Sequence, residues 1–208
     1  MSANVMANMN LELAKFGTIY TFVDFGNVNK WFDKDVWGPD GERLSSTEKL
    51  IVDIGKLANF TGQFSTRKFF YYGFDQSMKA SLHIKKSAKN NGFKTIAKPI
   101  QWIKDRADNK LRLIPKCNFD VEICLDIVRL IDFYDSICIF TSDNDFCLLL
   151  GYLQRKKKKV ILISRQPIRR SLKEKDLAVA RSGNRTRILE QGSGNYAAII
   201  ANKLKNAI

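Results

Sequence analysis

Histidine occurs only once in this chain of 208 residues, as His83. It lies between Leu82 and Ile84 in a predicted helix with no evident nucleophile nearby, which argues against a Ser-His-Asp hydrolase and favours a surface or packing role. The sequence also lacks the phosphate-binding P-loop motif. Its match to the dinucleotide fingerprint, GSGNYA at 192–197, is followed by too few residues for the second strand and acidic residue of such a site.

Cysteine pairs and long apolar runs are scarce as well. The four cysteines are irregularly spaced and form no Cys-x-x-Cys pair, so we expect free thiols in a reducing cytoplasm rather than a zinc site. No apolar run approaches the roughly 20 residues that cross a bilayer. Residues 1–16 lack the basic start and apolar stretch of a signal peptide. We therefore expect a cytoplasmic protein without a membrane partner.

Positive charge, in contrast, is abundant. The chain has 35 Lys and Arg against 21 acidic residues, for a net charge of +14. Residues 151–190 contain thirteen Lys or Arg against three acids, and a second basic stretch spans 85–112. A polyanion partner explains this clustering, because each neutralised phosphate releases bound counterions. A basic surface that serves only solubility is the alternative, and no long basic amphipathic helix indicates a membrane surface.

Apolar runs and helical patterns alternate along the chain. Short β-rich runs predict strands at residues 19–23, 68–72, 93–97, 136–140 and 160–163, with a last edge strand at 187–189. Helical spacing and capping residues predict helices at residues 45–60, 76–90, 120–133, 146–154 and 196–204, with one more opening at 171. The polar stretch 98–118 has no assigned element. Apolar strands separated by helices indicate an α/β fold with a parallel sheet buried on both faces.

Four aspartates occupy positions where such a sheet collects its ligands. Asp24 ends the first predicted strand, Asp143 and Asp145 follow the fourth, and Asp120 opens the helix before that strand. Because ligands bind beyond the carboxyl ends of parallel strands, these side chains can meet at one crevice. Clustered carboxylates repel unless a cation lies among them, and oxygen ligands suit Mg²⁺ or Mn²⁺. The alternative is that three of these aspartates only cap helices.

A hard cation beside a basic surface is suited to phosphodiester hydrolysis. An aspartate-based phosphatase would carry Asp-x-Asp after the first strand, whereas this position holds Asp24-Phe-Gly26. Trp31 falls in a polar loop, where its ring is a candidate for stacking on unpaired bases. A local loop cluster of Trp31 with Phe32 and Trp37 accounts for these residues equally well.

Three segments resemble, in order, the signature segments of NYN domains, the LabA-type branch of the PIN-like nucleases. They are FVDFGNVN at 22–29, KCNFDVEICLD at 116–126 and TSDNDFCLLL at 141–150. Family members typically show Asp-x-x-Asn, then a Lys-Gly-Asn-x-Asp-like segment, then Ser-x-Asp-x-Asp-Phe. Here Cys117 stands where glycine is usual, which keeps the acidic position and changes the residue at the turn.

The resemblance implies a fold, a reaction and a site. The fold is a PIN-like, Rossmann-like three-layer sandwich with a central, mostly parallel sheet. The reaction is metal-dependent hydrolysis of RNA, preferred over DNA, that leaves a 5′-phosphate and a 3′-hydroxyl. The implied Mg²⁺ or Mn²⁺ ligands are Asp24, Asp120, Asp143 and Asp145. Asn27 would hold a water or a phosphate, and Asp126, six residues beyond Asp120, lies on a different helix face.

The same resemblance, with the charge pattern, suggests residues that contact nucleic acid. They are Lys116, Ser142, which also supports its turn, Arg165, Arg169, Arg170, Arg185, Arg187 and Trp31. We expect one domain at residues 17–190, an N-terminal extension at 1–16 and a helical tail at 191–208. A non-catalytic RNA-binding adaptor with the same fold is the alternative function. A homo-oligomer is a further option that the sequence leaves open.

Overall fold

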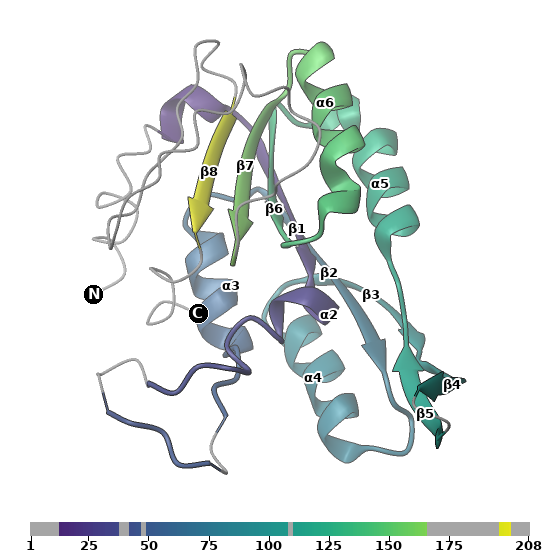
Figure 1. Ribbon diagram of the computed structural model, residues 1–208. Helices are drawn as coiled ribbons and strands as arrows, with labels where there is room; N and C mark the ends of the chain where they lie inside the picture. The colour runs from purple at the N-terminus through teal and green to yellow at the C-terminus, as the bar shows by residue number, and fades with distance from the viewer. Residues whose placement is uncertain (1–12, 38–41, 47–48, 108–109, 166–195, 201–208) are drawn as a thin grey trace.

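The computed structural model describes residues 13–37, 42–46, 49–107, 110–165 and 196–200. Six parallel strands form one sheet in the order β3-β2-β1-β6-β7-β8 (Figure 1). Their bounds are β1 Ile19–Asp24, β2 Arg67–Phe74, β3 Lys94–Pro99, β6 Ser136–Phe140, β7 Lys159–Ser164 and β8 Tyr196–Ile200. The predicted α/β fold with a central parallel sheet is confirmed. Two further strands, β4 Gln101–Ala107 and β5 Lys110–Lys116, form a separate antiparallel hairpin.

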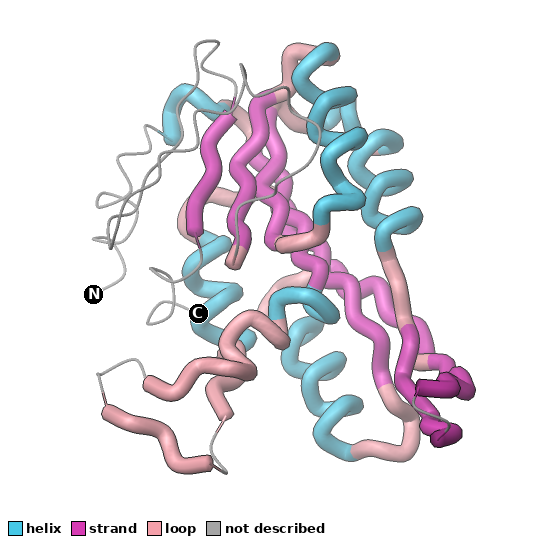
Figure 2. Tube along the Cα trace, viewed as in Figure 1, coloured by secondary structure: helices cyan, strands magenta, loops and turns pink. Residues whose placement is uncertain are grey.

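Helices flank the sheet on both faces, as Figure 2 shows. The α-helices are α2 Phe25–Val28, α3 Ile54–Gly62, α4 Lys79–Asn90, α5 Asp120–Arg129 and α6 Cys147–Arg155. Short 3₁₀ turns lie at η1 Leu13–Phe16, η2 Ile131–Phe133 and η3 Asn144–Phe146. Among the described helices, none is both long and apolar enough to cross a membrane.

Alternate residues of each strand enter two separate cores, because successive side chains of a strand point to opposite faces. In β1, Val23 joins the core under α2, α3 and α4, whereas Phe22 joins the core under α5 and α6. Both side chains are fully buried. Each such burial stabilises the fold by roughly 1.5–3 kcal/mol. The sheet is therefore the middle layer of the predicted three-layer sandwich.

Local capping sets where the helices begin and end. Helix α3 begins at Ile54 because the side chain of Asp53 accepts a hydrogen bond from the Lys56 backbone N–H at 2.9 Å. The prediction that this helix starts at residue 45 is therefore wrong, and Ser45 lies in a loop. Helix α4 ends before Gly92, which adopts a positive φ of 78° that favours glycine.

Two elements differ from the sequence-based prediction. Residues 98–118, left unassigned, contain the β4–β5 hairpin, whose strand pattern is obscured by lysines among its apolar residues. Tyr196–Ile200 forms strand β8, so a helix over the C-terminal tail is wrong there. A short apolar run such as Tyr196–Ile200 can form either a helix or a strand. Hydrogen bonding to the free edge of β7 makes it a strand here. The helix expected from 171 and the strand at 187–189 lie outside the described residues.

The strand order places a switch point between β1 and β6. From β1 the chain adds β2 and β3 on one side, and from β6 it adds β7 and β8 on the other. The connections leave the carboxyl ends of β1 and β6 in opposite directions, which opens a crevice there in folds of this kind. Asp24 and the Thr141–Asp143 turn both lie at this edge.

The hairpin is anchored to the sheet at its exit. A methyl group on Gly73 of β2 would lie 2.6 Å from Cβ and 2.7 Å from Sγ of Cys117, the residue that follows β5. Glycine is therefore required at this position by the close approach of Cys117. Cys117, which stands where the family usually has glycine, fits here because Gly73 of β2 has no side chain.

We expect Gly73→Ala to lower the free energy of unfolding by roughly 1–3 kcal/mol, because overpacking displaces the hairpin exit. Adding Cys117→Gly should restore much of this loss, whereas adding Cys117→Ala should not, since the clash involves Cβ. Urea denaturation of the single and double variants measures the coupling. Gly62→Ala is the matched control, because its methyl would meet only the Lys68 ammonium, at 3.9 Å. Equal recovery by both second substitutions would contradict the proposed clash.

Candidate active site

Three carboxylates converge at the switch point. Asp143 and Asp145 belong to the turn after β6, and Asp120 is the first residue of α5. Each offers an oxygen, and these oxygens all lie within 4.8 Å of one another. Asp120 and Asp143 are half-buried, and Asp145 is exposed. The structure thus brings together three of the four aspartates singled out by the sequence.

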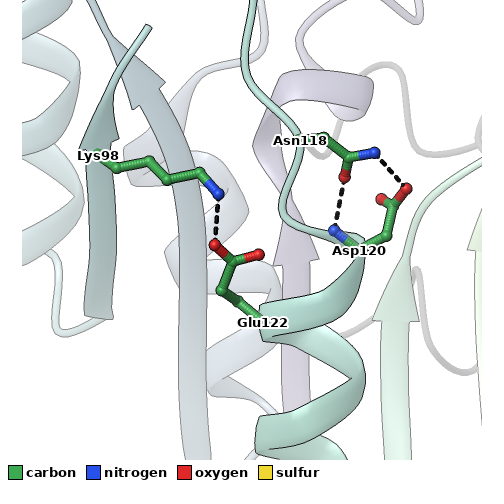
Figure 3. Close-up of polar contacts among 4 residues, drawn as sticks. All are labelled: Lys98, Asn118, Asp120 and Glu122. Carbon is green, nitrogen blue, oxygen red and sulfur yellow. Dashed lines mark hydrogen bonds and ion pairs between the residues drawn. The ribbon is translucent and has the colours of Figure 1, made fainter.

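Short-range hydrogen bonds orient these carboxylates. The Asn118 side chain donates to Asp120 Oδ2 and accepts from the Asp120 backbone N–H, both at 2.7 Å (Figure 3). Asp143 Oδ1 accepts from the Asp145 backbone N–H at 2.9 Å, which caps the 3₁₀ turn. Capping therefore explains part of the role of Asp143, as the alternative interpretation held. It does not explain why Asp120, which caps nothing through its side chain, faces the other two.

Asp24, the last residue of β1, is held by two hydrogen bonds at the same edge of the sheet. Its Oδ1 accepts from the Asn27 backbone N–H and its Oδ2 from the Thr141 hydroxyl, each at 3.3 Å. The pKa of Asp24 is raised to about 6, mainly by burial. The negative charges of Asp120 and Asp143 act in the same direction, and these two hydrogen bonds oppose the shift. The charges of Asp120 and Asp143 therefore affect the pKa of Asp24, although Asp24 is not one of the three converging carboxylates.

The pKa of Asp120 is raised as well. Burial is the largest cause, and the charges of Asp143, Asp145 and Glu122 act in the same direction, while the Asn118 hydrogen bond opposes them. These carboxylates are thus partly desolvated and mutually repulsive. A site of this kind is stabilised by a cation.

Asn27 is a structural bridge across the edge. Its Oδ1 accepts from the Trp31 indole N–H at 2.8 Å and from the Ser142 backbone N–H at 2.9 Å. Both lone-pair directions of this oxygen are therefore used within the protein. The resemblance implies that Asn27 contacts a water or a phosphate. This contact stays a prediction, and it would be made by the side-chain amide nitrogen, Nδ2, because Oδ1 is already used.

Trp31 does not serve as a base-stacking platform. Its side chain is 6% exposed and its ring centroid lies 6.4 Å from that of Phe140 in a stacked arrangement. The alternative of a local packing cluster is correct for this residue and for Phe32, which is also buried. Trp31 acts on the site indirectly, by fixing the side chain of Asn27.

Arg165 also differs from its predicted role. Its guanidinium forms an ion pair with Asp35 at 2.6 Å and lies 5.5 Å from the Phe32 ring centroid. Its backbone N–H donates to Ser142 Oγ at 2.8 Å, so Ser142 does support the turn. The guanidinium therefore joins two loops rather than standing free for phosphate. Arg169, Arg170, Arg185 and Arg187 lie outside the described residues.

An ion pair that the sequence did not predict lies beside the cluster. Lys98 of β3 pairs with Glu122 in the first turn of α5 (Figure 3). Partial burial acts to raise the pKa of Glu122, but the hydrogen bond and charge of Lys98 lower it. Glu122 lies two residues after Asp120, on a different face of the helix, so the local pattern did not indicate its pairing with β3. Lys116, the last residue of β5, is exposed four residues before Asp120.

Asp126 is separated from the cluster, as its helical spacing predicted. Its Oδ2 accepts from the hydroxyl of the buried Tyr71 at 2.8 Å. Burial and the hydrogen bond to Asp126 raise the pKa of Tyr71, which keeps the phenol protonated. Asp126 therefore satisfies a buried donor of the sheet and has a structural role.

We expect Asp24→Asn to raise the free energy of unfolding at pH 7–8, without metal, by roughly 1–3 kcal/mol. The folded-state pKa of about 6 exceeds the ordinary value of 3.8, so the folded chain binds more protons between these pH values. Wild-type stability therefore falls as pH rises through this window and levels off above it. Urea denaturation at several pH values should show the gain vanishing below about pH 4.

The control for this experiment is Asp132→Asn, which removes an exposed carboxylate from η2. It should change stability by less than about 0.5 kcal/mol at any pH. A pH-independent effect of Asp24→Asn would show that its carboxylate titrates normally in the fold.

Comparisons with known proteins identify the family of the chain. No curated protein matches the chain significantly in sequence. A crystal structure of a protein of unknown function from Vibrio parahaemolyticus is 21% identical, covers 71% of this chain and 81% of its own, and superposes with a TM-score of 0.49. The family model of the NYN domain matches residues 19–180, which span the sheet from β1 to β7 and all four aspartates. The chain therefore belongs to the NYN domain family, a family of PIN-like nucleases.

Proposed function

We propose that this chain is a Mg²⁺- or Mn²⁺-dependent ribonuclease that hydrolyses phosphodiester bonds of RNA at the acidic edge of its sheet. The observation that carries the proposal is the convergence of Asp120, Asp143 and Asp145 within 4.8 Å at the switch point of an NYN domain. We propose RNA rather than DNA as the substrate because of the family resemblance. The net charge of +14 supports a polyanionic substrate.

The donor set fits a hard divalent cation. All its atoms are carboxylate oxygens, which Mg²⁺ and Mn²⁺ prefer over the nitrogen and sulfur ligands typical of zinc. Asp120, Asp143 and Asp145 would hold the ion, and Asp24, which is within electrostatic reach of Asp120 and Asp143, is the candidate for a fourth carboxylate. When bound, such an ion lowers the pKa of a water and polarises a phosphoryl oxygen.

The protein's own residues set the geometry for this reaction. Asn118 holds the carboxylate of Asp120, and Thr141 with Asn27 holds that of Asp24. Water attacks phosphorus and the bond to the 3′ oxygen breaks, which leaves a 5′-phosphate and a 3′-hydroxyl. Lys116 is the described candidate for a phosphate contact, because it is exposed close to Asp120 in the chain. Arg169, Arg170, Arg185 and Arg187 remain candidates from the sequence.

The cysteines bear on where the protein works. All four are free, and Cys138 and Cys147 are buried. Free buried thiols suit a reducing compartment, so we propose a cytoplasmic enzyme.

Asp143→Asn should reduce cleavage of single-stranded RNA in Mn²⁺ by on the order of 100-fold or more, because one charged ligand is lost. Cleavage by the wild type should stop in EDTA. Thermal unfolding should show an intact fold, since the Asn side chain can still accept the hydrogen bond that caps the turn. Asp132→Asn serves as the control and should cleave like the wild type. Full activity of Asp143→Asn would exclude its proposed role.

A binding experiment separates the nuclease from a non-catalytic adaptor. The carboxylates repel a polyanion, so RNA should bind more tightly in Ca²⁺ than in EDTA at constant ionic strength. This gain should vanish in Asp24→Asn. Equal affinity in both buffers, together with no cleavage in Mn²⁺, would assign the chain to an adaptor that binds RNA through its basic surface alone.

A further inference from the structure

We infer that the β4–β5 hairpin is a stacking platform for an unpaired base of the RNA strand, with Trp102 as the stacking ring and Lys104 as a phosphate contact. This inference rests on the proposed function, because it assigns the strand a path next to the acidic cluster. It also narrows the substrate to RNA that is single-stranded on the hairpin side of the cut.

The exposure of the hairpin is the first observation. Trp102 is 52% exposed and Leu113 is 60% exposed, and Lys104 is exposed as well. The register pairs Trp102 with Pro115 and Lys104 with Leu113, so these four residues share one face of the hairpin. No helix covers this face among the described residues, in contrast to both faces of the main sheet. An exposed aromatic ring flanked by a lysine is the combination on which single-stranded nucleic acids stack.

The position of the hairpin is the second observation. Pro115 precedes Asp120 by five residues, so their Cα atoms are at most about 17 Å apart, and Trp102 lies directly beside Pro115. Figure 1 shows the hairpin below the N-terminal end of α5, on the side where the strands of the sheet end. A strand held at the acidic cluster therefore reaches Trp102 within a few nucleotides.

The root of the hairpin is fixed, which keeps this distance constant. Cys117 packs against Gly73 of β2 at its exit. Lys98, before its entry, pairs with Glu122 of α5 (Figure 3). The Ile100 backbone N–H also donates to the Phe74 carbonyl at 3.0 Å. The platform and the cluster are therefore joined through three contacts rather than by a free linker.

Charge favours RNA over a second copy of the chain as the occupant. Residues 98–116 contain six Lys or Arg and two Asp. Two such hairpins facing each other would bring like charges together, whereas a polyanion complements them. The apolar face and the positive charge are thus explained together by a nucleic acid strand.

The test measures binding of a short oligouridylate in EDTA, so that cleavage does not contribute. Trp102→Ala should weaken binding by about tenfold, as expected for the loss of one base-stacking contact. Trp102→Phe, which keeps an aromatic ring, should retain most of the affinity. Binding of a blunt RNA duplex should be unchanged, because its bases are not free to stack. Lys104→Ala should weaken both ligands and reduce the dependence of affinity on salt.

Phe133→Ala is the matched control, since Phe133 is 64% exposed in η2, beyond the opposite end of α5. It should leave oligouridylate binding unchanged. Equal affinity of wild type and Trp102→Ala would overturn the inference, and a loss of self-association in that variant would assign the face to a second copy instead. The proposed function fails separately, if no RNA is cleaved in Mn²⁺ while Trp102→Ala still weakens binding.

Discussion

The pairing of β1 with both β2 and β6 is the constraint on which the rest of the structure depends. β1 is hydrogen-bonded along its length on both sides, and its apolar side chains enter both cores. The strand therefore cannot shift by one residue without exchanging its buried faces. Asp24, the last residue of β1, is therefore held beside the turn after β6, where the Thr141 hydroxyl donates to its carboxylate. The acidic edge is thus a consequence of how the central strand is locked.

This edge is electrostatically unfavourable by itself. Burial and neighbouring charges raise the pKa values of Asp24 and Asp120, which means that the fold holds carboxylates where their ionised forms are disfavoured. Neutral groups rather than cations of the protein orient them, namely Asn118, Thr141 and the backbone of Asn27. The nearby lysine, Lys98, is paired with Glu122 and does not neutralise the cluster. Such strain at a functional site is what a bound cation would relieve.

The described basic residues differ in whether their charge is paired. Arg165 is bound to Asp35, whereas Lys116 and the hairpin lysine Lys104 remain exposed. In the proposed ribonuclease, the exposed lysines would attract phosphates and the carboxylates would hold a cation. On the hairpin, the exposed ring of Trp102 would add an apolar contact beside Lys104.

Five of the six strands of the main sheet, the helices between them and the aspartates at its carboxyl edge are predictable from the sequence alone. Apolar runs and capping residues are local signals, and the three aspartates Asp120, Asp143 and Asp145 follow from where those signals end. The burial of Trp31, the ion pair of Arg165 and the strand at Tyr196–Ile200 depend on tertiary contacts. Burial, ion pairing and strand pairing join residues far apart in the chain, so local sequence patterns do not predict them.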